Sequence, residues 1–207
     1  MNIIEVELEN WSIFVLKINW VAFIITLILL WGISFLMNKC MKYVNKRSIT
    51  VEEVNLGIGD SSIKLSYNQK DQEIAYKIWV ELSTRKIGLQ FDRENDVIKE
   101  VYDSWYKFFE ITRELLKDIP ASRIPYSEDL IELTEKVLNI GLRPHLTRWQ
   151  AKYRKWYEES VKNNSATPQE IQKEYPEYNA LIEDLLETNE RMIEYKKLMK
   201  KIAFGEK

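Results

Sequence analysis

The chain has 207 residues, of which 45% are hydrophobic and 12% aromatic, and its formal net charge is −2. This composition excludes an intrinsically disordered protein, because many apolar side chains are available for a core and only six Gly and five Pro interrupt them. The single Cys excludes an internal disulfide and most zinc frameworks, and the single His excludes a catalytic pair of histidines within one chain.

An apolar run near the N-terminus is the first element. Residues Trp20 to Met37 read WVAFIITLILLWGISFLM, which is 18 residues without a charge. A helix of this length is about 27 Å long, close to the ~30 Å hydrocarbon core of a bilayer. The apolar character continues back to Trp11. The sequence therefore predicts a transmembrane helix over residues 11–41, preceded by a short extracytoplasmic N-terminus over residues 1–10.

The charges on either side of this run predict its orientation. The N-terminal flank is acidic and no small-residue cleavage site follows the run, so a cleaved signal peptide fits poorly. A basic juxtamembrane segment over residues 42–49 places the C-terminal part in the cytoplasm by the positive-inside rule. Cys40 is either an unreactive thiol or a site of S-acylation. The basic residues assigned to the membrane surface are Lys39, Lys42, Lys46 and Arg47.

Four polar side chains interrupt the apolar helix. In helical projection they fall within about one third of its surface. A single span cannot enclose a channel, so a pore would need several copies of the chain. The alternative is a plain anchor that tolerates these polar residues. The candidates for lining a pore are Asn19, Thr26, Ser34 and Asn38.

The remaining elements are predicted from turns and helical periodicity. Short apolar alternation around two glycines predicts a β-hairpin over residues 50–68. Five helical segments follow, so the predicted fold is mainly α, with a transmembrane helix, a short hairpin and a cytoplasmic helical bundle over residues 69–207. The expected helices run from Gln69 to a stop at Gly88, from an N-cap at Asp92 to Pro120, from Ser127 to Gly141, from Pro144 onward, and from a capping box at Thr167–Glu170 to about Ala203 with a break near Pro176.

Enzyme motifs are missing from the sequence. It contains no phosphate-binding loop, dinucleotide fingerprint, zinc-protease helix or nucleophile elbow. Carboxylates cluster at Glu52/Glu53, Asp92/Glu94/Asp96 and Glu183/Asp184, where helix starts or solvated faces are the expected roles. We therefore expect a protein that is not an enzyme and that uses no cofactor or metal. A membrane-bound hydrolase with two carboxylates and a metal is the least supported alternative.

A basic, aromatic segment stands out in the cytoplasmic part. Between Lys136 and Tyr157 there is no Asp or Glu, and six Lys and Arg are present. Helical projection gathers large apolar residues into one stripe, which is predicted to be core: Leu146, Trp149, Tyr153, Trp156 and Tyr157. The basic flank is either a solvated face or a contact for a phosphate chain, a nucleotide or an acidic partner surface.

Pro144 is predicted to open a helix in this segment. The free N–H groups of that first turn, with Arg143 and His145 beside them, would favour a bound anion. The candidate anion-binding residues are Arg143, His145, Arg148, Lys152 and Lys155.

Three stretches carry a resemblance to a known family. VNLGIGDSSIKLSYNQKDQEIAYKIWVELSTRKIGL, VYDSWYKFFEITRELLKDIP and LNIGLRPHLTRWQAKYRKWY, together with the N-terminal anchor, resemble small membrane proteins encoded in bacterial anti-phage defence loci. The nearest are the transmembrane effectors of Hailong-type systems. The resemblance extends over residues 20–200. Its motifs are not patterns of catalytic or ligand-binding residues.

The resemblance implies a function as well as a location. It implies a homo-oligomeric channel in the bacterial inner membrane, for example a tetramer, that stays closed until infection. The implied partner is a nucleotidyltransferase whose nucleotide or oligonucleotide product controls the channel, without readout of duplex DNA. The residues that carry over as regulator contacts are Arg143, His145, Arg148 and Lys152. The alternative is a membrane-tethered binding or scaffold module without pore activity.

Overall fold

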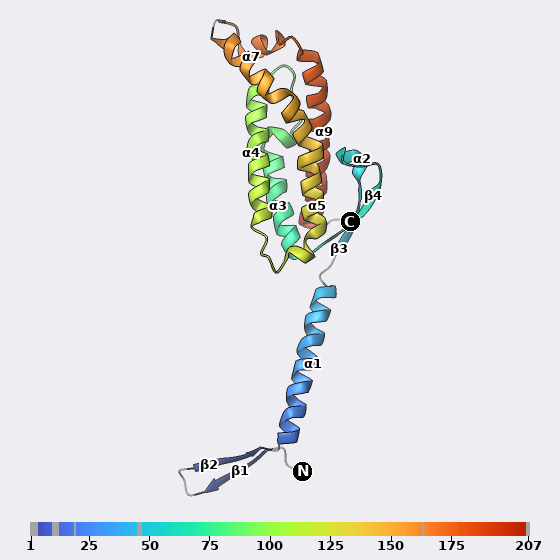
Figure 1. Ribbon diagram of the computed structural model, residues 1–207, viewed down its shortest axis with the longest axis vertical. Coiled ribbons are helices and arrows are strands. Elements are labelled where there is room, and N and C mark those ends of the chain that lie inside the picture. The colour runs from blue at the N-terminus through green and yellow to red at the C-terminus, as the bar shows by residue number, and fades with distance from the viewer. Residues whose placement is uncertain (1–3, 10–12, 19, 45–46, 163, 206–207) are drawn as a thin grey trace. The chain divides into compact units, whose positions relative to one another are not determined.

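The computed structural model describes residues 4–9, 13–18, 20–44, 47–162 and 164–205, and side chains from residue 20 onward except those of 22, 40–46 and 163. By its internal contacts the chain divides into two compact units, Met1–Lys46 and Arg47–Lys207, which are described separately. Figure 1 shows the elements of both.

The first unit contains a β-hairpin and one helix. β1 (Ile4–Glu9) pairs antiparallel with β2 (Ile13–Ile18), and Glu5 is the register partner of Lys17. Opposite charges at facing positions and the β-branched and aromatic residues of IFVLKI favour this pairing. α1 then runs over Trp20–Val44. The prediction of a helix over residues 11–41 was therefore wrong at its start, because residues 13–18 belong to a strand.

α1 exposes its apolar side chains. The large hydrophobic residues described on it are between 42% exposed, at Phe23, and 72% exposed, at Trp31. Within the described residues, no helix combines the length and the apolar character expected of a membrane span, and the predicted transmembrane helix is not supported by them.

The second unit begins with the predicted hairpin. β3 (Arg47–Glu52) pairs antiparallel with β4 (Ser62–Tyr67), so the prediction of a hairpin over residues 50–68 is confirmed, with a start three residues earlier. The connection is not a tight turn, because it contains one turn of helix, α2 (Glu53–Leu56). Gly57 ends that turn with a φ of 65°, in the left-handed region that favours glycine.

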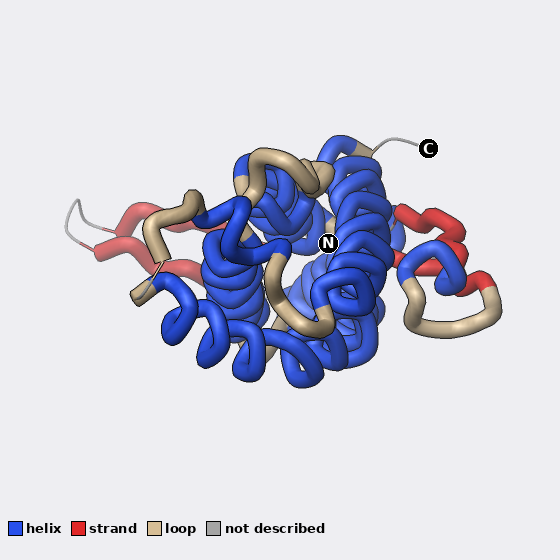
Figure 2. The backbone as a smooth tube through the Cα atoms, turned by 90° about the horizontal axis from the view of Figure 1, so that it is seen from above, coloured by secondary structure: helices blue, strands red, loops and turns tan. Residues whose placement is uncertain are grey.

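Helices make up the rest of the second unit. α9 packs along α3, and Figures 1 and 2 show α3, α4, α5 and α9 running side by side. The mainly helical prediction is confirmed. In chain order the helices are α3 (Gln69–Thr84), a short 3-10 turn η1 (Lys86–Gly88), α4 (Ile98–Lys117), a second 3-10 turn η2 (Ile124–Tyr126), the segment from α5 (Glu128–Lys136) to α7 (Ala151–Val161), α8 (Pro168–Lys173) and α9 (Tyr178–Phe204).

Helix caps partly follow the sequence. The capping box predicted at Thr167 is present, and Asn68 forms a second one at the start of α3. Asp92, however, caps a turn rather than a helix, since its Oδ1 accepts from the N–H groups of Glu94 and Asn95. α4 begins later, and the N–H of its first residue, Ile98, donates to Oε1 of Gln172 at 2.9 Å. The prediction that Asp92 caps this helix was wrong because a side chain distant in sequence caps it instead.

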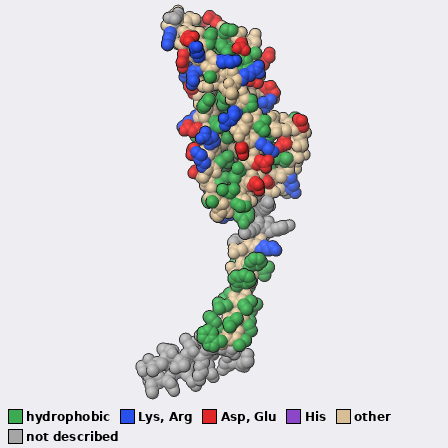
Figure 3. Space-filling model, viewed as in Figure 1, with side chains coloured by type: hydrophobic (Ala, Val, Ile, Leu, Met, Phe, Trp, Pro, Cys, Tyr) green, Lys and Arg blue, Asp and Glu red, His purple; other side chains and the backbone are tan. Residues whose placement is uncertain are grey.

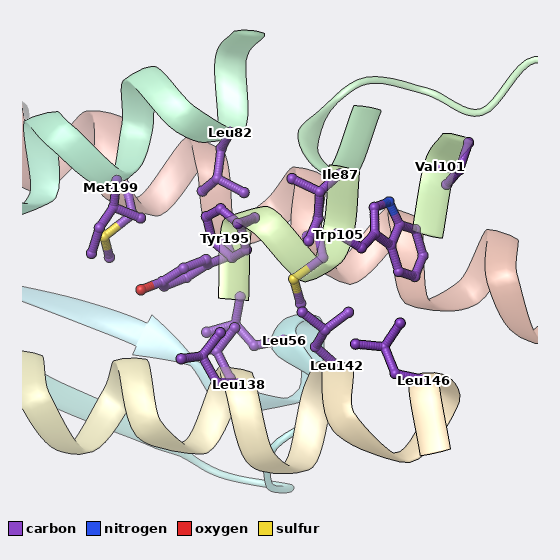
Figure 4. Packing of buried hydrophobic residues seen from close by; sticks show 14 of the residues in the cluster. Leu56, Leu82, Ile87, Val101, Trp105, Leu138, Leu142, Leu146, Tyr195 and Met199 are labelled. Carbon is purple, nitrogen blue, oxygen red and sulfur yellow. The ribbon is translucent and has the colours of Figure 1, made fainter. Parts of the chain in front are cut away.

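The core of the second unit lies between its long helices. Figure 4 shows Trp105 of α4, Leu82 of α3, and Tyr195 and Met199 of α9 packed together, all of them fully buried. In the described part of the chain, the buried hydrophobic cluster extends from Val51 to Ile202. The Arg47–Lys207 unit therefore has a complete core of its own.

Candidate functional site

The basic, aromatic segment lies on one uninterrupted helical path. α5 continues into a π-helical turn η3 (Val137–Leu142), then α6 (Arg143–His145), a second π-helical turn η4 (Leu146–Gln150) and α7. Arg143, directly before the proline, has helical φ and ψ of −56° and −41°. The predictions that Gly141 ends a helix and that Pro144 opens one were therefore wrong.

The π turn η3, which directly precedes α6, explains how Pro144 is accommodated inside a helix. In an α-helix a proline removes one hydrogen bond and its ring clashes with the carbonyl four residues earlier. A π turn adds one residue to the hydrogen-bonded ring and so relieves that contact. Because the helix continues through this point, no free helix N-terminus lies at Pro144, and the anion site predicted there has no exposed N–H groups to use.

His145 forms the centre of a buried polar cluster. Its ring is 3% exposed and lies between three helices. Nε2 lies 3.1 Å from the Tyr102 hydroxyl of α4, and Nδ1 lies 2.8 Å from Oδ2 of Asp184 on α9. Nε1 of Trp149 donates to the same carboxylate oxygen at 2.6 Å. The prediction that His145 contacts an external anion was therefore wrong, because both ring nitrogens already have protein partners.

The surroundings of His145 favour one neutral tautomer. Burial lowers the pKa of the imidazole, an effect that the hydrogen bond to Asp184 opposes in part and the charge of Arg148 reinforces. Burial also raises the pKa of Tyr102, so its hydroxyl keeps its proton. The Tyr102 hydroxyl then donates to Nε2, and the Nδ1–H donates to Asp184. The cluster is fully paired, and its geometry ties α4, α6 and α9 together.

The aromatic stripe of the segment is core, as predicted. Leu146, Trp149, Tyr153 and Tyr157 are buried, and Trp156 is half-buried. The Tyr153 ring stacks on that of Tyr157 at a centroid distance of 5.6 Å and meets Tyr175 edge-on at 5.3 Å. These rings join α7 to the segment that follows α8.

A row of exposed cations remains on the outer side of this helix. We call Arg148, Lys152 and Lys155 the basic row, since their spacing of four and three residues places them on one side of a helix. No ion pair joins any of the three to a carboxylate among the described residues. The Arg148 guanidinium lies over the Trp149 ring at 4.8 Å. Figure 3 shows Lys and Arg side chains over the region labelled α7 in Figure 1.

Arg143 does not belong to the basic row. Its Nε donates to Oδ1 of Asn139 at 3.0 Å, and its guanidinium lies over the Phe109 ring of α4 at 4.9 Å. Of the five predicted anion-binding residues, the structure thus brings together Arg148, Lys152 and Lys155, keeps Arg143 against α4, and buries His145.

The predicted carboxylate clusters have structural roles. Glu53 is buried and pairs with Lys136, and Asp96 is buried and pairs with Lys86. Glu52 accepts from the side chain of Asn55. Among the residues that the structure describes, no group of three His, Cys, Asp or Glu is placed to hold a metal ion.

The structure describes some, but not all, of the residues predicted to line a pore or to lie at the membrane surface. Thr26 donates to the carbonyl of Phe23 at 3.2 Å, as helical threonines often do. Ser34, Asn38, Lys39 and Arg47 are exposed. Asn19 lies outside the described residues, and so do the side chains of Lys42 and Lys46.

Asp184, Tyr102 and Trp149 were not recognised as one site from the sequence. The sequence signal nearest to this site was the single His within a basic segment that has no Asp or Glu. That signal predicted an external anionic ligand, whereas the structure shows an acceptor within the protein, Asp184. Comparisons with models of protein families, with curated proteins and with solved structures find no match to this chain.

Proposed function

We propose that this chain is a membrane effector of bacterial anti-phage defence, in which α1 anchors several copies in the inner membrane and forms a pore between them. The Arg47–Lys207 unit would act as the cytoplasmic sensor, and an anionic nucleotide or oligonucleotide would bind its basic row. The enzyme that makes this regulator would be the partner, as the resemblance to Hailong-type effectors implies.

One observation carries this proposal. The large apolar side chains described on α1 are exposed, while the Arg47–Lys207 unit completes its own core without them. An apolar helix surface of this extent is expected to be covered, and lipid together with further copies of α1 would provide that cover. The uncharged sequence from Trp20 to Met37 has 18 residues. As one helix it would be about 27 Å long, close to the ~30 Å hydrocarbon core of a bilayer.

The basic row supports the choice of an anionic regulator. Three cations on one helix side without an ion pair to a described carboxylate leave their charge available to phosphate groups. The buried cluster behind them joins this helix to α4 and α9 through His145 and Asp184. A ligand on the outer side would therefore act on a helix that is rigidly connected to the core.

The experiment that tests the pore is induced expression in bacteria carrying a membrane-potential dye, with and without phage infection. We expect the potential to collapse with the native α1 and to persist when α1 is replaced by an unrelated apolar helix of equal length. A second candidate function, a tethered scaffold, predicts the same result for both anchors, namely no collapse.

A matched pair of variants sharpens this test. Ser34→Leu fills the polar side of α1, whereas Ile28→Leu changes a residue that helical projection places away from it. We expect Ser34→Leu to reduce ion flux and Ile28→Leu to leave it unchanged. Equal effects of the two would remove the predicted lumen from the proposal.

A further inference from the structure

One end of the Arg47–Lys207 unit carries large apolar side chains on its surface. Phe204, the last residue of α9, is 51% exposed, and Tyr76 of α3 is 48% exposed. Their rings meet edge-on at 6.2 Å, and Trp79, half-buried, completes the group at 5.3 Å from Phe204. Ile124, the first residue of η2 before α5, is also 48% exposed. We call Tyr76, Trp79, Ile124 and Phe204 the apolar end.

Hydrogen bonds place these residues at the same end of the unit as Arg47. Arg47 is the register partner of Tyr67. The next residue, Asn68, donates from its side chain to the carbonyl of Tyr126, at 2.9 Å. One turn into α3, Gln72 donates to the carbonyl of Ile202 at 3.2 Å. Figure 3 shows hydrophobic side chains gathered at this end of the unit.

The chemistry of this end fits a lipid surface. Trp, Tyr and Phe are the side chains that occupy the boundary between headgroups and acyl chains. Arg47 and Arg123 are exposed there. Cations beside exposed aromatic and aliphatic groups complement anionic headgroups above an acyl layer.

The covalent chain brings a bilayer close to this end. Only residues 45 and 46 separate the last residue of α1 from Arg47. Three Cα–Cα steps span at most about 11 Å. The uncharged run of α1 ends at Met37, and the seven helical residues from there to Val44 add about 10 Å. A membrane that holds this run, as in the proposed function on which this step rests, therefore lies within about 22 Å of Arg47.

We propose that the apolar end docks on the anionic lipid surface next to the anchor. The cytoplasmic unit then stands on the membrane at a fixed end, with Phe204 and Ile124 in the headgroup region. The opposite end, where α7 finishes at Val161, points away from the lipid. The helical path from Glu128 to Val161 is roughly 50 Å long, so the two ends are well separated.

Site-specific labelling of the full chain tests this docking. Cys40 is the only cysteine, so Cys40→Ser gives a background without thiols. A fluorophore is attached to Phe204→Cys in one protein and to Val161→Cys in another, Val161 being a matched apolar position that is 42% exposed. Both are reconstituted into phosphatidylcholine vesicles with phosphatidylglycerol, with and without lipids that carry a quencher near the headgroup.

We expect the quenching lipid to reduce the emission at position 204 at least about twofold, because the proposed docking puts this position at the headgroups. The emission at position 161 should stay unchanged, because contact quenching does not reach the far end of the unit. Omission of phosphatidylglycerol should weaken the quenching at 204. No quenching at 204, or equal quenching at both positions, would overturn the docking. If the labels at position 204 of two copies contact and quench each other in place of quenching by the lipid, the apolar end is an interface with a second copy. That result would also overturn the docking.

Alkaline carbonate extraction of the same vesicles separates this inference from the proposed function. If the protein stays in the membrane pellet and position 204 is not quenched, the anchor holds and the docking is wrong. If the protein is extracted, α1 is not inserted, and both proposals fail together.

Discussion

His145 and Asp184 lie 2.8 Å apart, Nδ1 to Oδ2, although 39 positions separate them in the chain. The carboxylate oxygen accepts from a second buried donor as well, the indole N–H of Trp149. One carboxylate oxygen on α9 thus accepts hydrogen bonds from two side chains of the helical segment that carries the basic row. These are His145, directly before Leu146, and Trp149, three residues after it.

Removing this carboxylate should destabilise the Arg47–Lys207 unit. Asp184→Ala leaves the Nδ1–H of His145 and the Nε1–H of Trp149 buried without an acceptor. We expect a loss of about 2–4 kcal/mol in the free energy of unfolding, measured by urea denaturation of that unit. Glu183→Ala is the control, because Glu183 is exposed on the same helix, and it should change stability by less than about 0.5 kcal/mol. Similar losses in both variants would contradict the pairing.

Acidification should destabilise the same cluster. His145 has a lowered pKa in the folded state, so as the pH falls below about 6.5 the unfolded chain binds a proton before the folded one does. Stability therefore decreases as the pH falls through this window, by at most about 1.4 kcal/mol per pH unit. The groups that face the imidazole are Tyr102 from α4, Asp184 from α9 and Arg148 from its own helix.

The measurement is the free energy of unfolding between pH 5 and pH 7.5, for the parent and for His145→Gln. The variant has no histidine, so the decrease between pH 6.5 and the lowered pKa should be absent from it. A decrease of the same slope in the variant would assign the pH dependence to other groups.

Asn189 should contribute as much to the free energy of unfolding as a large core residue does. It is buried on α9, its amide donates to the carbonyls of Ile87 and Leu89 at 3.0 Å, and its Oδ1 accepts from the N–H of Phe91 at 3.0 Å. Asn189→Ala leaves these three backbone groups without their partner. We expect a loss of about 2–4 kcal/mol in urea denaturation and faster hydrogen exchange of the Phe91 amide. Glu190→Ala, at the exposed neighbouring position, should show neither change.

Charge reversal in the basic row tests the regulator site. Arg148→Glu with Lys152→Glu should weaken binding of a single-stranded oligonucleotide at least about tenfold at low salt and reduce the salt dependence of binding. The matched control is Lys107→Glu with Lys117→Glu, which changes the net charge equally but at cations that already pair with Glu110 and Glu114. Equal loss of binding in the two double variants would indicate an effect of net charge and would exclude the basic row as a specific site.

The sequence predicted the elements whose signals are local. The capping box at Thr167, the break near Pro176 and the hairpin that ends at Tyr67 depend on residues a few positions apart, and all three are confirmed. The aromatic stripe around Tyr153 was equally predictable, because large apolar residues at helical spacing have to be covered.

Elements that depend on distant partners were not predictable in this way. Asp92 has the properties of a helix cap, yet Gln172 caps α4, and only the packing of α8 against that end reveals it. Pro144 has the local properties of a helix start, and the π turns that carry the helix past it have no sequence signal of their own. The same limit applies to His145, whose acceptor lies on another helix.

The buried imidazole has one practical consequence. Because the chain contains a single histidine, its ring protons give one isolated set of resonances in an NMR spectrum, free from overlap with other imidazoles. Those resonances originate where α4, α6 and α9 meet. Any ligand, lipid or neighbouring copy that separates these helices should shift them, so the native protein contains a spectroscopic reporter without any added label.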